Sequence, residues 1–166
     1  GENKVQEAAE KWKEIKKKNS KIKLHMIGKL QTNKVKFAVP LFDYIHSVDS
    51  EKLAKKISEE QYKYEKKMKI FIQVNIGKEN QKSGVNQEVL QNFYDYCIKL
   101  NLDIVGLMCI PPIKENPKNL FKKMHDLNKK LKLKELSMGM SADYIEATKN
   151  FSTYLRIGSK IFGSRN

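Results

Sequence analysis

The sequence predicts an α/β fold in which the strands run parallel. Short apolar segments with strand character alternate along the whole chain with segments whose apolar residues recur at helical spacing. Two turns in the last third, residues 137–141 and 156–159, are rich in Gly and Ser, as expected of loops that leave strands. No linker, repeat or change of composition divides the 166 residues, so we expect a single domain over residues 1–166.

The strand predictions rest on short apolar runs that end at Gly, Pro or polar residues. Residues 70–74 are mostly apolar, as expected of a strand that is covered on both faces. The fourth run stops at Pro111 and Pro112, which cannot continue a ladder. Because a helix follows each strand, the crossovers are expected to be right-handed. The six predicted strands are residues 22–27, 44–48, 69–76, 104–110, 135–139 and 154–157.

The helix predictions rest on apolar residues three and four positions apart and on end signals. Val5, Ala8 and Trp12 share one face of the first helix, with charged residues between them. Pro40 is expected to stop the second helix, and Pro117 suits the first turn of the fifth. Asp49 or Ser50 is expected to cap the third helix. The predicted helices are residues 2–18, 31–38, 51–60, 87–100, 117–131 and 142–150, with a helical turn from 159.

The formal charge of +14 raises the question of nucleic-acid binding. Only Arg156 and Arg165 are arginines, however, whereas base readout favours the guanidinium group. The lysines are spread along predicted helices such as residues 11–18 and 122–134, which is typical of solvated helix faces. We therefore expect no specific nucleic-acid partner, and a basic nucleic-acid-binding module is the second alternative.

Cellular location and redox state follow from what the sequence lacks. No apolar run approaches the ~18 residues that a membrane span needs, and residues 1–4 do not resemble a signal peptide. The expectation is a cytoplasmic protein without a membrane partner. Cys97 and Cys109 lie singly in apolar surroundings without metal-ligand spacing, so we expect reduced core thiols and no metal site.

Six strands leave a choice between an open doubly wound sheet and part of an eight-stranded barrel. Barrels often hold phosphate after their last two strands, where this chain has its Gly- and Ser-rich turns. An open sheet usually holds it after the first strand, at a G-x-G-x-x-G that is absent here. This comparison favours the barrel, although six strands are two short of the number that closes one.

Residues 25–34 (HMIGKLQTNK) resemble the signature of the pyridoxal phosphate homeostasis protein family, whose fold is an alanine-racemase-like (β/α)8 barrel. Further segments follow in family order: 1–7, 45–49, 73–76, 82–84, 106–108, 136–141, 156–158 and 161–163. The resemblance aligns residues 1–3 with the end of the family's second strand. On this basis we expect about the first two strands of the barrel to be missing and six to be present.

The family's Schiff-base lysine lies on its first strand, so the resemblance implies that this lysine is not in the present chain. Lys34 and Lys82 stand in family motifs, but both are expected on polar loops or helix starts. A Schiff-base lysine must instead be desolvated and aimed from the barrel interior. No catalytic residue is therefore assigned.

The resemblance implies that pyridoxal 5′-phosphate (PLP) is the cofactor. It places Arg156 near the pyridine nitrogen, where a permanent cation makes the ring a poorer electron sink. Hydroxyl and backbone N–H groups at helix starts also suit a phosphate dianion on physical grounds. Against this, the same Gly and Ser residues are common in plain turns and caps. The predicted phosphate residues are Ser137, Gly139, Ser141, Gly158 and Ser159.

Four further polar residues near strand ends are expected around the cofactor ring or at the pocket wall: Asn3, His25, Ser47 and Asn75. Each also has a plain structural interpretation. His46 is expected to be a packing residue and His125 a surface residue, because neither has partners at metal-ligand spacing.

The function that the resemblance implies is PLP homeostasis, in which the cofactor is held and exchanged, with PLP-dependent apoenzymes as candidate partners. It implies no established enzymatic activity. The first alternative is a fold-type III PLP enzyme, an amino-acid racemase or decarboxylase. Nothing in the sequence supplies the second acid/base group that a racemase needs.

Overall fold

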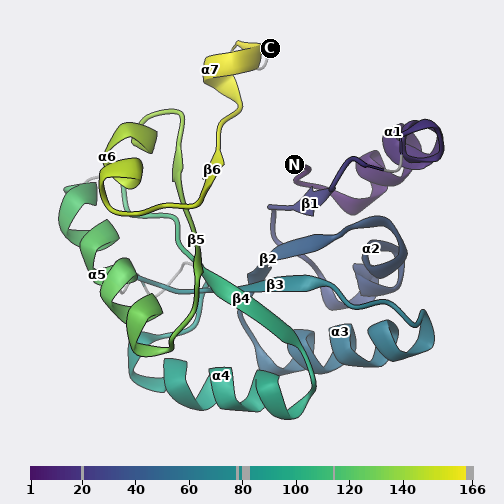
Figure 1. Ribbon diagram of the computed structural model, residues 1–166, viewed down its shortest axis with the longest axis horizontal. Coiled ribbons are helices and arrows are strands. Elements are labelled where there is room, and N and C mark those ends of the chain that lie inside the picture. The colour runs from purple at the N-terminus through teal and green to yellow at the C-terminus, as the bar shows by residue number, and fades with distance from the viewer. Residues whose placement is uncertain (20, 78, 80–82, 114, 164–166) are drawn as a thin grey trace.

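The computed structural model describes residues 1–19, 21–77, 79, 83–113 and 115–163. Lys82 and Arg165 lie outside the described residues. All six strands form one parallel sheet whose spatial order follows the chain (Figure 1). The prediction of an α/β fold with six parallel strands is therefore confirmed. The strands are β1 (His25–Met26), β2 (Tyr44–Val48), β3 (Lys69–Gln73), β4 (Asp103–Met108), β5 (Glu135–Met140) and β6 (Tyr154–Arg156).

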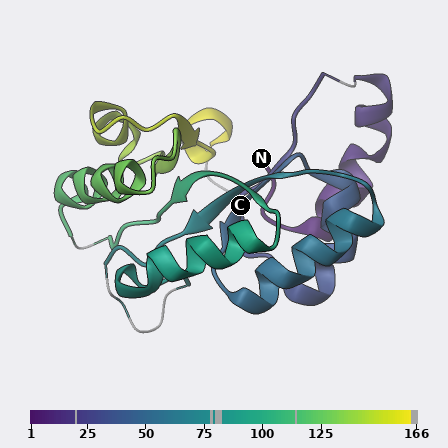
Figure 2. The ribbon, with the colours of Figure 1, turned by 60° about the horizontal axis from the view of Figure 1, so that its bottom comes forward.

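Helices cover the outer side of the curved sheet, and the last short helix projects beyond the end of β6 (Figures 1 and 2). Glu2 bridges Met26 in parallel, so the start of the chain lies along the outer edge of β1. The helices are α1 (Val5–Lys18), α2 (Val35–Leu41), α3 (Glu51–Lys63), α4 (Leu90–Lys99), α5 (Pro117–Lys130), α6 (Tyr144–Lys149) and α7 (Ser159–Phe162). Short 3-10 turns, Thr32–Lys34 and Gln87–Val89, lead into α2 and α4.

Two predicted boundaries differ from the structure for identifiable reasons. The first strand is limited to His25–Met26, because the backbone N–H of Leu24 donates to the carboxylate of Asp43 instead of joining a ladder. Pro40 does not stop α2 but lies inside its last turn, and the helix continues to Leu41. A proline there removes one hydrogen bond only, and its own carbonyl accepts the ammonium of Lys66.

The apolar core fills the space between the sheet and its helices. Its largest members, including Phe42, Ile57 and Phe121, are fully buried. Cys97 and Cys109 are both buried in it, and burial raises the pKa of each thiol to about 12. These thiols are therefore protonated near neutral pH, and the prediction of buried core cysteines is confirmed.

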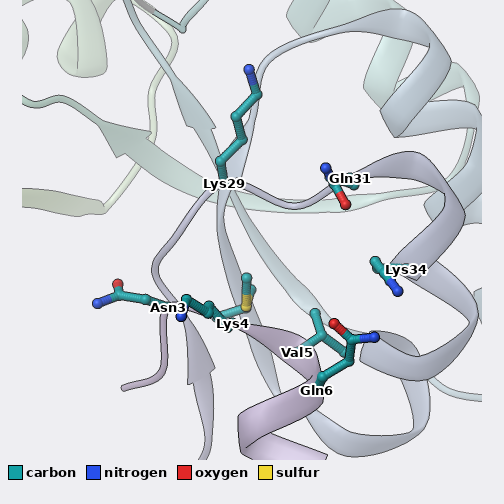
Figure 3. Close-up of a pocket in the computed structure, with 8 residues that line it drawn as sticks. Asn3, Lys4, Val5, Gln6, Lys29, Gln31 and Lys34 are labelled. Atoms are coloured by element: carbon teal, nitrogen blue, oxygen red, sulfur yellow. The ribbon is translucent and has the colours of Figure 1, made fainter.

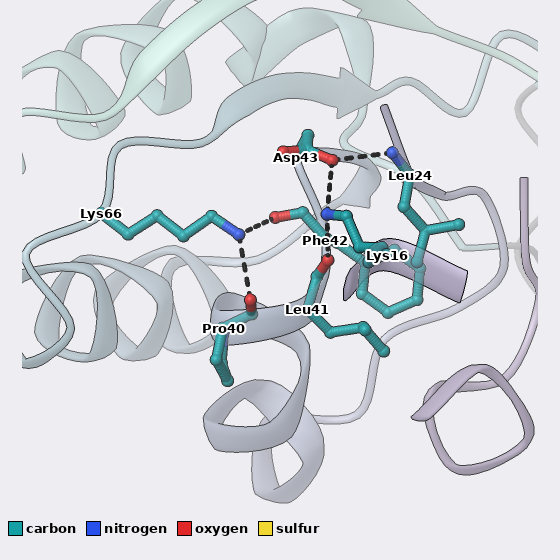
Figure 4. Close-up of polar contacts among 7 residues, drawn as sticks. All are labelled: Lys16, Leu24, Pro40, Leu41, Phe42, Asp43 and Lys66. Carbon is teal, nitrogen blue, oxygen red and sulfur yellow. Dashed lines mark hydrogen bonds and ion pairs between the residues drawn. The ribbon is translucent and has the colours of Figure 1, made fainter. Parts of the chain in front are cut away.

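A polar network closes the amino-terminal end of the sheet, where Asp43 precedes β2 (Figure 4). The Asp43 carboxylate accepts the ammonium of Lys16 at 2.8 Å and the backbone N–H of Leu24 at 2.7 Å. Lys16 also donates to the carbonyl of Leu41, and Lys66 donates to that of Phe42. Burial acts to raise the pKa of Asp43, but the bonds from Lys16 and Leu24 outweigh it and lower that pKa below its usual value.

Candidate functional site

A cavity of about 530 Å³ lies beyond the carboxyl-terminal ends of β5 and β6. The carboxyl ends of the strands are also where α/β barrels build their sites. It is formed by the turn after β5 and by the segment from the end of β6 through α7. The lining residues are Met140, Ser141, Ala142, Arg156, Gly158, Ser159, Phe162 and Gly163.

Arg156 supplies the positive charge of this cavity. Its Nη1 donates to Ser137 Oγ at 2.7 Å, and its Nη2 donates to the backbone carbonyl of Cys109 at 2.8 Å. Burial lowers the pKa of the guanidinium, but an arginine side chain remains charged in proteins. Two of its five N–H donors are thus used to hold the guanidinium plane, and the side chain also faces the cavity.

The neighbouring turns add hydrogen-bonding groups and free space. Ser141 Oγ accepts the backbone N–H of Lys160 at 3.3 Å, which joins the two turns. Within the described part of the chain, the backbone N–H groups of Gly158 and Ser159 have no hydrogen-bond acceptor. A Cβ atom added at Gly158 would meet nothing within 4 Å, so this backbone is open to an incoming group. A cation, hydroxyls and unpaired N–H donors form a suitable cradle for an anion such as a phosphate.

Beneath Arg156, a chain of polar side chains crosses the concave side of the sheet. Ser137 Oγ lies 2.8 Å from His46 Nδ1, and His46 Nε2 lies 3.0 Å from His25 Nδ1. Burial is the main cause that lowers the pKa of His46 to about 2 and that of His25 to about 4. Both imidazoles are therefore neutral near neutral pH.

His46 was expected only to pack, and it does stack on Phe71 with ring centroids 4.3 Å apart. Its hydrogen bonds to His25 and Ser137 are the feature of the candidate site that the sequence does not predict. A signal was present, because Tyr44 and His46 alternate on one face of β2, and Tyr44 pairs in register with His25.

The predicted phosphate residues fall into two groups. Ser141, Gly158 and Ser159 line the cavity with Arg156. Ser137 is fully buried inside β5, where its hydroxyl contacts Arg156 and His46. Gly139 also lies within β5, at a φ of 92° that only glycine adopts readily.

Two other candidate residues, Ser47 and Asn75, and His125, which the sequence predicts at the surface, have structural contacts away from this cavity. Ser47 Oγ donates to the carbonyl of Gly28 at 2.7 Å. The Asn75 side chain donates to the backbone carbonyl of Glu79 at 2.9 Å and accepts the backbone N–H of Glu79 at 3.3 Å. His125 is half-buried and stacks on the ring of Phe151.

Asn3 lies at a second, smaller cavity of about 290 Å³ beside the start of α1 (Figure 3). Lys29 and Lys34 belong to the same lining, and in Figure 3 the Lys29 side chain points away from Lys34. Asn3, Ser47 and Asn75 are thus not brought together with the Arg156 cavity, whereas His25 is connected to it through His46. In the part of the chain that the structure describes, no cluster of His, Cys, Asp and Glu is suited to a metal ion.

Comparison with known proteins agrees with this geometry. The family model for the alanine racemase N-terminal domain matches residues 1–166. The chain is 39% identical to a pyridoxal phosphate homeostasis protein of Aquifex aeolicus, with 99% of this chain and 76% of that protein covered. This chain belongs to the pyridoxal phosphate homeostasis protein family. The family resemblance inferred from residues 25–34 is therefore confirmed.

Solved structures show the same relationship at the level of the fold. PipY of Synechococcus elongatus, solved with PLP bound, is 34% identical with a TM-score of 0.89, over 98% of this chain and 80% of that chain. Alanine racemase of Clostridium difficile, at 18% identity and a TM-score of 0.69, shares the fold over 95% of this chain and 44% of its own. The six parallel strands are accordingly an open part of an alanine-racemase-like barrel. No helix within the described ranges is long and apolar enough to cross a membrane.

Proposed function

We propose that this chain binds PLP at the Arg156 cavity and holds and exchanges that cofactor. The observation that carries the proposal is the convergence of a half-buried guanidinium with unpaired N–H groups and open space at Gly158. PLP is an anionic phosphate ester with a planar ring, which this set of donors fits. Membership of the family, and the PLP bound in the structure of PipY, support the same choice of ligand.

Each lining residue has a distinct part in this proposal. Ser141, together with the backbone N–H groups of Gly158 and Ser159, would bind the phosphate. Arg156 would face the ring and, as a permanent cation, keep its pyridine nitrogen unprotonated. When bound, PLP supplies an electron-accepting ring, and an unprotonated nitrogen weakens that capacity. Such an arrangement suits storage of the cofactor better than turnover.

Binding by this chain is proposed to be non-covalent and without an enzymatic reaction. None of the described residues that line the cavity is a lysine. Taken together, these residues also do not include two side chains that could act as a general acid and a general base. The proposed acceptors of the cofactor are PLP-dependent apoenzymes. Transfer to them is measurable as recovery of activity when a PLP-free enzyme is mixed with the loaded chain.

The test is a PLP titration followed by absorbance and by ³¹P NMR, with borohydride reduction and peptide mass mapping at saturation. We expect saturable binding without stoichiometric labelling of a single lysine. The Arg156→Met variant should bind about tenfold more weakly, since a charge-assisted hydrogen bond contributes about 1.5 kcal/mol or more. Lys149→Met is the matched control, because Lys149 is exposed on nearby α6 and pairs only weakly with Glu146.

Three results would overturn parts of this proposal. Equal affinity of Arg156→Met and the unaltered chain would exclude the Arg156 cavity as the site. One lysine labelled stoichiometrically would show covalent binding. Amino-acid turnover by the PLP-loaded chain would favour a racemase or decarboxylase instead.

A further inference from the structure

The guanidinium of Arg156 is the first member of a row of hydrogen-bonded side chains on the concave side of the sheet, on the side of Arg156 that faces away from the cavity. This hydrogen-bond chain runs from Arg156 on β6 through Ser137 on β5 and His46 on β2 to His25 on β1. Its three links measure 2.7, 2.8 and 3.0 Å. Four strands thus contribute one residue each, and Ser137 and His46 are almost completely buried.

The direction of hydrogen bonding in this chain follows from Arg156, which can only donate. Ser137 Oγ must therefore accept from Arg156 Nη1. Because Ser137 is fully buried, its own hydroxyl proton also needs an acceptor. Among the described residues, the acceptor bonded to this hydroxyl is Nδ1 of His46, so that nitrogen carries no proton.

The tautomers of both histidines are then determined. A neutral imidazole without a proton on Nδ1 has its proton on Nε2. His46 Nε2 accordingly donates to His25 Nδ1, and His25 likewise keeps its own proton on Nε2. The reverse arrangement, with a proton on His46 Nδ1, would leave the buried Ser137 hydroxyl without an acceptor, which is costly in a dry interior.

We propose that His46 is a positioning residue for Arg156. By accepting the Ser137 hydroxyl proton, it turns the oxygen lone pairs toward Arg156 Nη1 and so fixes the guanidinium that faces the cavity. Arg156 Nη2 is held independently, by its hydrogen bond to the carbonyl of Cys109. His46 therefore affects only one of the two hydrogen bonds that orient the guanidinium, the bond from Nη1 to Ser137. The effect on cofactor affinity rests on the proposed function, whereas the tautomers do not.

The direct test is long-range ¹H–¹⁵N NMR of the unaltered chain labelled with ¹⁵N-histidine, without PLP. We expect His46 and His25 each to show an unprotonated Nδ1 and a protonated Nε2 near neutral pH. A protonated Nδ1 on His46, or a charged His46 ring, would overturn the proposal. This result does not depend on whether the chain binds PLP.

The functional test compares two variants of one residue. His46→Asn keeps an acceptor near the position of Nδ1, whereas His46→Leu removes it. We expect His46→Leu to weaken PLP binding about fivefold and His46→Asn to stay within about twofold, as for the loss of one neutral hydrogen bond. His125→Leu is the control, because His125 lies on α5 and stacks only on Phe151.

Unchanged affinity in His46→Leu, or equal losses in the Leu and Asn variants, would contradict the positioning role. If His46→Leu does not fold, the NMR result on the unaltered chain decides. If the unaltered chain does not bind PLP, the proposed function fails, and the tautomers still test the hydrogen-bond chain.

Discussion

At the amino-terminal end of the sheet, the carboxylate of Asp43 accepts hydrogen bonds from groups of its own chain. At the carboxyl-terminal end, Arg156 has N–H donors that none of the described hydrogen bonds uses. Asp43 accepts Lys16 and the backbone of Leu24, and Lys66 binds nearby carbonyls (Figure 4). Arg156 uses two of its N–H groups on Ser137 and Cys109 and turns the rest of the guanidinium to a cavity.

This difference indicates that the Asp43 network contributes to stability and that the Arg156 cavity is suited to binding. A network whose donors and acceptors are matched within the chain stabilises the fold and offers nothing to a ligand. A charged group held at one side only, beside backbone N–H groups without acceptors, retains capacity for an anion. Substitutions at the two ends should therefore have effects of different kinds.

The largest expected effect on stability is at Asp43. Asp43→Ala removes the acceptor of Lys16 and of the Leu24 backbone, so the free energy of unfolding should fall by about 2 kcal/mol or more. Urea unfolding followed by circular dichroism measures this change. Asp126→Ala, at an exposed position of α5, is the control. Equal stability of the two variants would show that the amino-terminal network does not support the fold.

Gly158→Val should affect binding and leave stability almost unchanged. The added side chain meets no atom near its Cβ, so unfolding should shift by less than about 0.5 kcal/mol. The same side chain would enter the space proposed for the phosphate, and PLP affinity should fall at least about tenfold, or about 1.4 kcal/mol. Isothermal titration with PLP checks this prediction. Full affinity in this variant would place the cofactor elsewhere.

The pH dependence of stability should distinguish the two ends of the sheet. The pKa of His25 falls from 6.5 to about 4 in the folded chain, so between these values the unfolded chain binds more protons. The contribution of His25 to the free energy of unfolding is fully present above pH 6.5 and is lost as the pH falls toward 4. The pKa of Asp43 is lowered from 3.8, so its contribution is lost only below that pH.

Urea midpoints measured from pH 7 to pH 3 test this separation. His25→Gln should make the profile less steep between pH 6.5 and 4 without abolishing the slope, because the lowered pKa of His46 also contributes over this window. The loss below pH 3.8 should stay in place. Identical slopes in the variant and the unaltered chain over the upper window would refute the assignment to His25.

The smallest expected effect is at an exposed ion pair. Lys4 and Glu7 are 2.6 Å apart at the start of α1, but both side chains are mostly exposed. Glu7→Gln should change the free energy of unfolding by less than about 0.5 kcal/mol, and added salt should reduce the difference. A loss comparable with that of Asp43→Ala would mean that burial does not explain the contrast between the two networks.

The sequence predicted most of the fold because periodicity is a local property. The six strands followed from short apolar runs that alternate with helical segments, and Pro117 begins α5 as expected. The extent of β1 did not follow, because it depends on Asp43, which lies 19 positions from Leu24. Pro40 was misplaced because the penalty of a proline is small in a last helical turn.

The candidate site shows the same division between local and distant information. Ser141, Arg156, Gly158 and Ser159 lie in two short segments at the ends of β5 and β6, and small residues beside a rare arginine were visible in the sequence. The contact between His46 and Ser137 was not visible, because the two residues are 91 positions apart in the sequence. Which polar residues meet inside a barrel depends on strand order and register, and neither is given by a single segment.

The most direct test of the account is a PLP titration of the ¹⁵N-labelled chain followed by ¹H–¹⁵N correlation spectra. We expect the backbone signals of Ser141, Gly158 and Ser159 and the side-chain signal of Arg156 to move with one saturation curve. Signals of the Lys16 and Asp43 network should stay in place. Shifts confined to the cavity near Asn3 and Lys34, or no saturable shift at all, would contradict it.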